Sequence, residues 1–247
     1  MSIKNILISQ RPPQAANPYS ALIDKYGLKI DFRPLFVIEP LTSREFRAHR
    51  INFTEFTAVV FSSRTMIDAF FAICEELRIK VPDTLKYFCT TEAVAMYLQK
   101  HIVYRKRKIF YGNGTPASII DLIGSKHKAD KFLVATSAEA PHSAIVSALE
   151  GAGLDVEGCV FVKPVYQDIK DLDIKSYDMF IFYNQADVKS LLENYPDFQQ
   201  DDAKFFAYGK SVEAALEEAG LSIAIKGPNP EVPSVCKGLE LLLAKGN

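Results

Sequence analysis

Four short polar turns in this sequence each follow an apolar run and open an amphipathic pattern. They are Ser62-Ser63-Arg64-Thr65, Thr90-Thr91-Glu92, the residues from Asn184 to Asp187, and Gly209-Lys210-Ser211. This succession is typical of a strand, a loop and the start of a helix. Because the first backbone N–H groups of a helix have no partner inside it, they attract anions. The four turns therefore predict an anion-binding surface built from helix N-termini.

The same turns can also be simple helix caps, because serine, threonine and asparagine are common first residues of helices. The segment 65–68 fits a capping box, in which a threonine and an aspartate bond to each other's backbone N–H groups. On that interpretation Ser62, Ser63 and Arg64 are left over for a ligand. Because all four turns occupy the same place after a strand, we favour a binding site over capping alone.

Most other chemistries lack their motifs. The sequence contains no G-x-G-x-x-G, Walker A, G-x-S-x-G or H-E-x-x-H motif. Its 4 histidines and 4 cysteines share no ligand spacing, so we expect no metal site and no cofactor. A net charge of −1 and the absence of tryptophan and of an RNA-binding signature argue against a nucleic-acid partner. The basic run within residues 104–112 fits either a solvated strand edge or attraction of a polyanion.

The compartment is indicated by what the chain lacks. The opening segment MSIKNILISQRPP has too short an apolar run for a signal peptide, and no run has the length needed to span a bilayer. The cysteines are scattered and never form C-x-x-C, which is typical of reduced cysteines in a cytosolic protein. We therefore expect a cytoplasmic protein without a membrane partner. For lack of an interface signal, we also expect a monomer.

The elements that carry these turns occur twice along the chain. The first half predicts strands at 5–9 and 57–61, with helices at 17–26 and 65–77. The second half repeats the order in KFLVATS, YDMFIFYNQADV and AKFFAYGKSVEAAL. Such a repeat predicts an internal duplication of an α/β unit with parallel sheets, and two domains whose ligand-binding edges face a cleft. The pattern alone would divide the chain near residue 128, between the repeats.

Three segments of the duplicated pattern resemble the uroporphyrinogen-III synthase family, and together they extend the resemblance over essentially the whole chain. AVVFSSRTMIDAFF resembles the family's strand that ends in Phe-Thr-Ser before a helix, and VKPVYQD resembles its Val-Tyr at the end of a linking strand. AYGKSVEAALEEAGL resembles the Gly-x-Thr-Thr-Ala segment, and PNPEVPSV follows it where the family has a Pro-Thr-Pro-like loop. The order and spacing of these segments make the resemblance fairly specific.

The resemblance implies an α/β fold of two flavodoxin-like or Rossmann-like domains with parallel sheets, joined by a two-stranded β linker. Mapped onto this chain, the first domain is 1–36 plus 170–247 and contains both termini. The second domain is 40–165, and the linkers are about 32–42 and 158–169. This division crosses the boundary near residue 128 that the repeats suggest.

The function implied by the resemblance is that of a lyase (a hydro-lyase) of porphyrin, tetrapyrrole and haem biosynthesis. It closes the linear tetrapyrrole hydroxymethylbilane to uroporphyrinogen III with inversion of ring D. The substrate carries eight carboxylates, is already reactive, and closes unaided to the wrong isomer, so the enzyme acts mainly by positioning and electrostatics. The family's linker tyrosine matches Tyr166, a candidate proton donor to the departing hydroxyl. Tyr166 can also be an ordinary aromatic residue at a strand end.

The substrate-binding candidates all lie at or next to the polar turns. They are Arg11, Ser62, Ser63, Arg64, Thr91, Asn184, Gln185, Gly209, Lys210 and Ser211. The chain departs from the family's turns at Thr90 to Ala93, at Val212 and at Phe182 to Ala186. Two alternatives are left open, and these departures motivate the first of them. One is a non-catalytic ligand-binding or regulatory protein of the same descent, and the other is an unrelated α/β binding protein with a convergent duplication.

Overall fold

Short, almost wholly apolar runs form the central strands of two separate β-sheets. Residues 58–61 read Ala-Val-Val-Phe and residues 179–182 read Met-Phe-Ile-Phe, and every one of these side chains is buried. Such runs suit parallel sheets, because helices cover both faces. The computed structural model describes residues 3–103 and 105–245, so residue 104, at the start of the basic run, lies outside the described residues.

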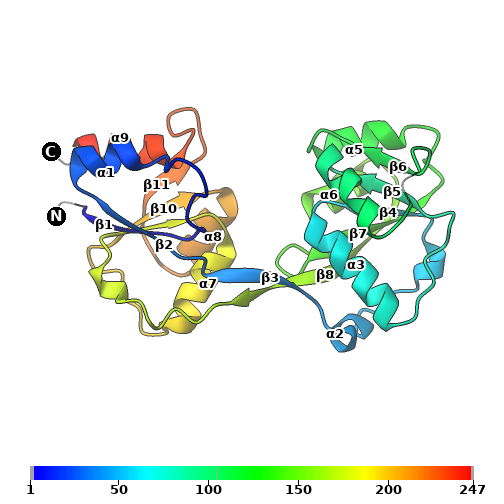
Figure 1. Cartoon of the computed structure of the whole chain (residues 1–247), viewed down its shortest axis with the longest axis horizontal. Coiled ribbons are helices and arrows are strands. Elements are labelled where there is room, and N and C mark those ends of the chain that lie inside the picture. Colours follow the sequence, from blue (N-terminus) through cyan, green and yellow to red (C-terminus); the bar gives the residue numbers. More distant parts are fainter. Residues whose placement is uncertain (1–2, 104, 246–247) are drawn as a thin grey trace. The chain divides into compact units, whose positions relative to one another are not determined.

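The first unit consists of the residues up to Val37 and those from Val165 onward. Its sheet has the order β11-β10-β9-β1-β2, and all neighbouring strands are parallel. The strands are β1 (Asn5–Ile8), β2 (Lys29–Phe32), β9 (Met179–Phe182), β10 (Lys204–Tyr208) and β11 (Ile223–Gly227). Helices α1 (Ser20–Tyr26) and α9 (Val235–Lys245) pack on one face, and α7 (Gln185–Asn194) and α8 (Lys210–Glu218) pack on the other (Figure 1). A short helix, η3 (Ile174–Ser176), precedes β9.

The second unit consists of residues 38–164 and has a sheet of the order β3-β8-β7-β4-β5-β6. Its strands are β3 (Phe36–Pro40), β4 (Ala58–Phe61), β5 (Lys86–Cys89), β6 (Ile109–Tyr111), β7 (Lys131–Ser137) and β8 (Asp155–Tyr166). Helices α3 (Arg64–Glu76) and α4 (Glu92–Tyr97) cover one face, and α5 (Pro116–Ile123) and α6 (Ala144–Gly151) cover the other. The remaining short helices are α2 (Ser43–Arg47), η1 (Phe53–Glu55) and η2 (Leu98–Lys100).

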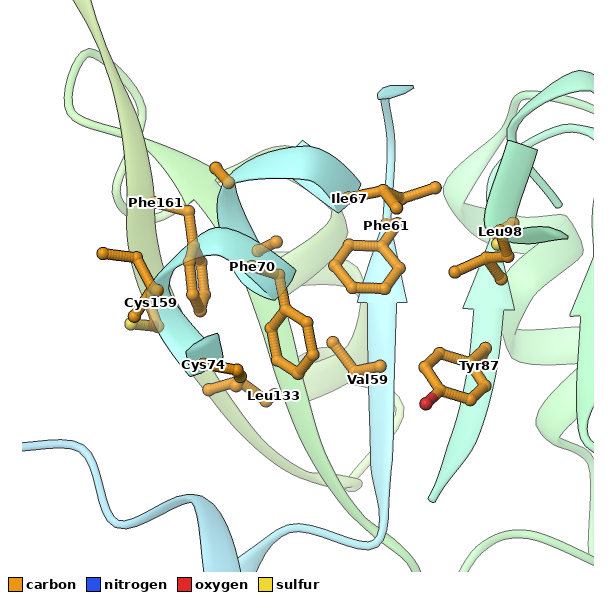
Figure 2. Packing of buried hydrophobic residues seen from close by; sticks show 14 of the residues in the cluster. Val59, Phe61, Ile67, Phe70, Cys74, Tyr87, Leu98, Leu133, Cys159 and Phe161 are labelled. Atoms are coloured by element: carbon orange, nitrogen blue, oxygen red, sulfur yellow. The ribbon is translucent and has the colours of Figure 1, made fainter. Parts of the chain in front are cut away.

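An aromatic cluster fixes α3 on its sheet. The ring of Phe70 lies 5.3 Å from that of Phe61 in β4 and 5.6 Å from that of Phe161 in β8. Figure 2 shows Phe70 between these two strands, with Leu133 and Val59 beneath it. Because aromatic pairs at such spacing stabilise a core beyond their buried area, the helix has one defined seat. The N-terminus of α3 is therefore held firmly at the end of β4.

The chain passes from one unit to the other twice, within β3 and within β8. The N–H of Leu41 donates to the carbonyl of Phe161, and that of Gln167 donates to the carbonyl of Leu35, both at 2.9 Å. The low-numbered end of one strand thus meets the high-numbered end of the other, so this pair is antiparallel. The expected α/β class with parallel sheets is confirmed.

The strand orders of the two sheets correspond when the sequence repeats are matched. β9, β10 and β11 occupy in one sheet the places that β4, β5 and β6 occupy in the other, and β1 and β2 match β7 and β8. Each unit therefore combines strands from both halves of the chain. This is the order that a duplication of the chain predicts. The chain accordingly changes unit at 37/38 and 164/165, and not between the repeats near residue 128.

Candidate functional site

Each sheet has one place where the connections from two neighbouring strands leave in opposite directions. In the first unit these strands are β1 and β9, and in the second unit they are β7 and β4. Open parallel sheets bind ligands outside the carboxyl ends of such strands. The segments to inspect are therefore the loops after β1 and β9, and those after β4 and β7.

The turn after β4 differs from the expected capping box. Ser63 is extended and caps α3, because its hydroxyl oxygen accepts from the N–H of Met66 at 3.2 Å. The helix begins at Arg64, so Thr65 is its second residue and not its cap. The expectation of a box between Thr65 and Asp68 is wrong. The helix begins two residues earlier than the capping pattern implied, because Ser63 already supplies the cap, while the hydroxyl of Ser62 donates to the sulfur of Met66 at 3.1 Å.

Asp68 takes part in a different contact. Its carboxylate accepts from the hydroxyl of Tyr97 at 2.7 Å and pairs with Nε2 of His101 at 2.8 Å. Burial alone would raise the pKa of Asp68, but these two hydrogen bonds hold it below its usual value. Tyr97 in turn lies beneath Arg64, whose guanidinium carbon is 5.5 Å from the ring centre. Asp68 thus helps to fix the ring on which Arg64 rests.

The N-terminus of α3 offers several donors that no protein carboxylate uses. The backbone N–H groups of Ser62 and Ser63 meet no acceptor within residues 3–103 and 105–245. Arg64 is exposed and has no ion-pair partner in that part of the chain. The first turn of the helix contains no acidic residue. An exposed cation and free N–H groups at the positive end of a 13-residue helix form an anion-binding arrangement.

Thr91 lies beside this turn and acts as a cap. Its hydroxyl oxygen accepts from the N–H of Val94 at 3.4 Å at the start of α4, a helix of 6 residues. Thr90 is buried and donates to the carbonyl of Ser62 at 3.4 Å, which ties the two turns together. Glu92 accepts from the hydroxyl of Tyr111 at 3.1 Å. This neighbouring turn therefore supports the first one and adds a negative charge.

One segment at the same edge was not selected from the sequence. The loop of residues 138–142 follows β7, beside β4, and leads to Ser143, which caps α6. His142 pairs with Glu150 at 3.1 Å and is exposed. The signal was present in the sequence, because SAEAPHS after KFLVAT has the same strand, polar loop and helix order as the chosen turns.

The corresponding turn of the first unit is already filled. Asn184 caps α7 by accepting from the N–H of Ala186 at 3.0 Å. The Oδ2 atom of Asp187 accepts from the N–H groups of Tyr183 and Asn184, both at 3.0 Å, and from the hydroxyl of Ser9 at 2.7 Å. Asp187 is only 1% exposed. The N–H groups that match those of Ser62 and Ser63 are therefore occupied by the protein's own carboxylate.

The other candidates of the first unit lie at neighbouring strand ends. Gly209 caps α8 with a φ of 135°, a value that side-chain-bearing residues rarely adopt. Lys210 and Ser211 follow it and are exposed, and Arg11 is exposed in the loop after β1. Neither Arg11 nor Lys210 pairs with a carboxylate in the described residues. Gln185 is the half-buried first residue of α7.

The substrate-binding candidates thus form two groups, one in each unit. Arg11, Asn184 and Gln185 lie at one place where strand connections diverge, with Gly209 to Ser211 at the next strand end. The segment 62–64 lies at the other such place, with Thr91 at the next strand end. Tyr166 belongs to none of these turns. It is the half-buried last residue of β8.

Two hollows of the first unit lie at the opposite edge of its sheet. Their volumes are about 420 and 570 Å³, and Lys175, Phe198 and Asp201 contribute to both. The smaller hollow also contains Asp178 and Lys204, at the amino ends of β9 and β10. Its aspartates would repel a polyanion, so size alone does not make it the better site.

The described residues contain no helix that is long and apolar enough to cross a membrane. Comparison with protein families matches residues 17–237 to the model described as uroporphyrinogen-III synthase HemD. No curated protein matches the chain.

Solved structures show the same fold. Uroporphyrinogen-III synthetase from Helicobacter pylori 26695 is 17% identical with a TM-score of 0.55, over 98% of this chain and 100% of that one. A mutant uroporphyrinogen III synthase from the extremely thermophilic bacterium Thermus thermophilus is 16% identical with a TM-score of 0.51, over 98% of this chain and 99% of that one.

Proposed function

Because this chain belongs to the uroporphyrinogen-III synthase family, we infer that it is a uroporphyrinogen-III synthase of tetrapyrrole biosynthesis. Its substrate is the linear tetrapyrrole hydroxymethylbilane, and its product is uroporphyrinogen III. The observation that carries this inference is the family match over residues 17–237. The overall reaction expels water as the ring closes, which places the enzyme among the hydro-lyases.

We propose that the turn at residues 62–64 binds one of the substrate's carboxylates. The support is the pair of backbone N–H groups of Ser62 and Ser63, which have no acceptor among the described residues, together with the exposed cation of Arg64. Thr90 bonds to the carbonyl of Ser62 and so ties this turn to the neighbouring helix start, which Thr91 caps. Two N–H bonds fix the position of a carboxylate, and a neighbouring guanidinium balances its negative charge.

The first unit contributes differently in this proposal. Arg11 and Lys210 are exposed cations, and Gly209 and Ser211 offer backbone N–H groups at the start of α8. Asn184 and Gln185 remain candidates through their side-chain amides, because the backbone N–H groups of this turn are bound to Asp187. The first unit therefore binds the substrate mainly by side chains and α8.

Tyr166 is the proposed proton donor. A phenol that donates its proton to the hydroxymethyl oxygen lets that oxygen leave as water when the C–O bond breaks. The substrate then carries an electrophilic carbon, which the already bridged α-carbon of ring D attacks to form the spiro intermediate. The bond from that ring D carbon to its original bridge carbon then breaks, and the freed bridge carbon is attacked by the other α-carbon of ring D, so that the ring is inverted. The proton that this second α-carbon loses as the pyrrole becomes aromatic again restores the phenol. Support comes from the position of Tyr166 at the end of β8, on the strand pair that links the units.

The isomer ratio tests the function directly. Freshly generated hydroxymethylbilane is supplied to the protein, the products are oxidised to porphyrins, and isomers I and III are separated. We expect isomer III to predominate. Isomer I alone, formed at the uncatalysed rate, would refute the synthase assignment and favour a non-catalytic protein of the same descent.

A second measurement tests Tyr166. Tyr166→Phe should slow the formation of isomer III about 100-fold, in the usual range for loss of a general acid. Tyr26→Phe is the matched control, because Tyr26 lies at the far end of α1 from the candidate turns. Equal rates in the two variants would remove Tyr166 from the mechanism.

We also propose that residues 1–36 with 170–247 and residues 40–165 act as two domains, linked at about 32–42 and 158–169. A cytoplasmic monomer without nucleic-acid or membrane partners completes the proposal. Its 4 cysteines are all unbonded, which suits a reducing compartment. Gel filtration with light scattering would test the monomer, and a mass of two chains would refute it.

A further inference from the structure

Three tyrosines meet at the carboxyl edge of the first sheet, although they are far apart in the sequence. Tyr208 is the last residue of β10, Tyr183 follows β9, and Tyr19 ends the loop after β1. These three strands are neighbours in the sheet. The rings of Tyr183 and Tyr208 are 5.4 Å apart, and the hydroxyls of Tyr19 and Tyr183 are 3.3 Å apart.

The hydroxyls of this cluster are not equally engaged. Tyr208 donates to the carbonyl of Pro233 at 3.0 Å, so its proton is used. Tyr19 and Tyr183 share one hydrogen bond, and two hydroxyls carry two protons. No protein acceptor in the described residues takes the second proton. One O–H of the pair is therefore available to a ligand.

Exposure and backbone contacts indicate which hydroxyl this is. Tyr19 is only 6% exposed, whereas Tyr183 is half-buried. The N–H of Tyr183 is fixed by the buried carboxylate of Asp187 at 3.0 Å. The position of Tyr183 is thus set by its backbone bond to Asp187 and by its contacts with Tyr19 and Tyr208, directly after β9 and beside β1.

Both phenols stay protonated under ordinary conditions. Burial raises the pKa of Tyr183, and burial also raises that of Tyr19. A protonated phenol donates a hydrogen bond to an anion without adding charge. Exposed cations lie close by in the chain, since Arg11 is in the loop that leads to Tyr19 and Lys210 follows Gly209. The surroundings thus favour an anionic acceptor.

We propose that the hydroxyl of Tyr183, supported by that of Tyr19, donates a hydrogen bond to a carboxylate of the tetrapyrrole. Either hydroxyl can be the donor in the contact between Tyr19 and Tyr183, so on binding Tyr19 can donate to Tyr183 while Tyr183 donates to the carboxylate, and each bond then polarises the next. This role rests on the proposed synthase function, since it takes the polycarboxylate as ligand. It gives the first unit a carboxylate contact that its α7 terminus lacks, because Asp187 already occupies that terminus.

The test uses three variants that each remove one hydroxyl and keep the ring. Tyr183→Phe should raise KM for hydroxymethylbilane about tenfold and leave kcat nearly unchanged, as expected for loss of a neutral donor to a charged acceptor. Tyr19→Phe should raise KM about threefold, because Tyr183 keeps its proton but loses its support. Tyr208→Phe is the control and should leave KM unchanged, because its hydroxyl is bound to Pro233.

A binding measurement separates this inference from the proposed function. Calorimetric titration with uroporphyrin III, a stable octacarboxylate, should show about tenfold weaker binding for Tyr183→Phe than for Tyr208→Phe. That result would support the inference even if the protein formed only isomer I, in which case the synthase assignment alone would fail. Equal affinities in the two variants, or no binding by the unaltered protein, would overturn the role of Tyr183. Thermal unfolding of each variant verifies that the fold is retained.

Discussion

Met66→Asp would place at the start of α3 a carboxylate like that of Asp187, which occupies the backbone N–H groups at the start of α7. Met66 is the third residue of α3, and Asp187 is the third residue of α7. Asp187 takes two backbone N–H groups at 3.0 Å each. An aspartate at position 66 would reach the N–H groups of Ser62 and Ser63 in the same way, since both turns follow a buried strand and precede a capped helix.

The size of the effect follows from these bonds. A hydrogen bond to a charged group contributes about 1.5–3 kcal/mol, so loss of two such contacts, about 3–6 kcal/mol together, should raise KM by at least about 100-fold even without the added repulsion. Folding should suffer little. An acidic residue in the first turn stabilises a helix by about 0.3–1 kcal/mol, which offsets part of the lost packing of the half-buried Met66. Binding and stability should therefore change independently.

The assay compares Met66→Asp with Met66→Asn and Met66→Leu by initial rates of isomer III formation and by thermal unfolding. Met66→Asn has the same shape without the charge, and Met66→Leu keeps an apolar side chain. We expect a large rise in KM only for the aspartate. The same KM for aspartate and asparagine would refute the reasoning, because the charge at the α3 terminus would then be irrelevant to the substrate.

The remaining predictions concern stability and are measured by urea unfolding followed by circular dichroism, since the chain has no tryptophan. Asp187→Asn should lower the free energy of unfolding by about 3 kcal/mol, because Asp187 is only 1% exposed. Asp68→Asn should lower it by at most about 1 kcal/mol, because the side chain of Asp68 is 46% exposed. Equal losses in the two variants would contradict this reasoning. Gly238→Ala should destabilise the protein by about 1–3 kcal/mol, because a Cβ at this position would lie 2.5 Å from Cε1 of Phe206. This cost should exceed the gain from the better helix propensity of alanine. A gain in stability would show that Phe206 moves freely. Burial opposes ionisation of Asp130, but its bonds to Lys86 and Thr57 hold its pKa below the usual value. Its contribution is therefore complete above the unfolded-state pKa of about 3.9 and is lost as the pH falls through the lower pKa of the folded state, so the stability gap between wild type and Asp130→Asn should shrink at low pH.

Features that are determined by residues close together in the chain could be predicted from the sequence. Apolar runs such as those at 58–61 and 179–182 are buried strands, and Gly27 ends α1 in the left-handed conformation that glycine permits. Polar turns after strands could be located for the same reason, because strand, turn and helix are contiguous. The choice of cap was less secure. Ser63 and Thr65 are both candidates in the sequence, and the structure shows that Ser63 is the cap.

Contacts between distant segments were not predictable from the pattern. Ser9 meets Asp187 across 178 positions of sequence, and Tyr19 meets Tyr183 across 164. Each pair depends on β1 lying beside β9, which follows from exchange of strands between the two halves of the chain. An interpretation of each repeat by itself pairs β1 with its own half and misses these contacts.

The turns that precede α7 and α3 differ in the side chains that meet them, because each sheet combines strands from both halves of the chain. The carboxylate at the third position of α7 has a third donor, the hydroxyl of Ser9, which directly follows β1 in the other half of the chain. At α3 the third position is Met66, whose sulfur accepts from the hydroxyl of Ser62 at 3.1 Å, and no carboxylate of the described residues takes the N–H groups of this turn. The two turns are thus unequal, because the α7 terminus binds the protein's own carboxylate whereas the N–H groups of Ser62 and Ser63 meet no acceptor within residues 3–103 and 105–245.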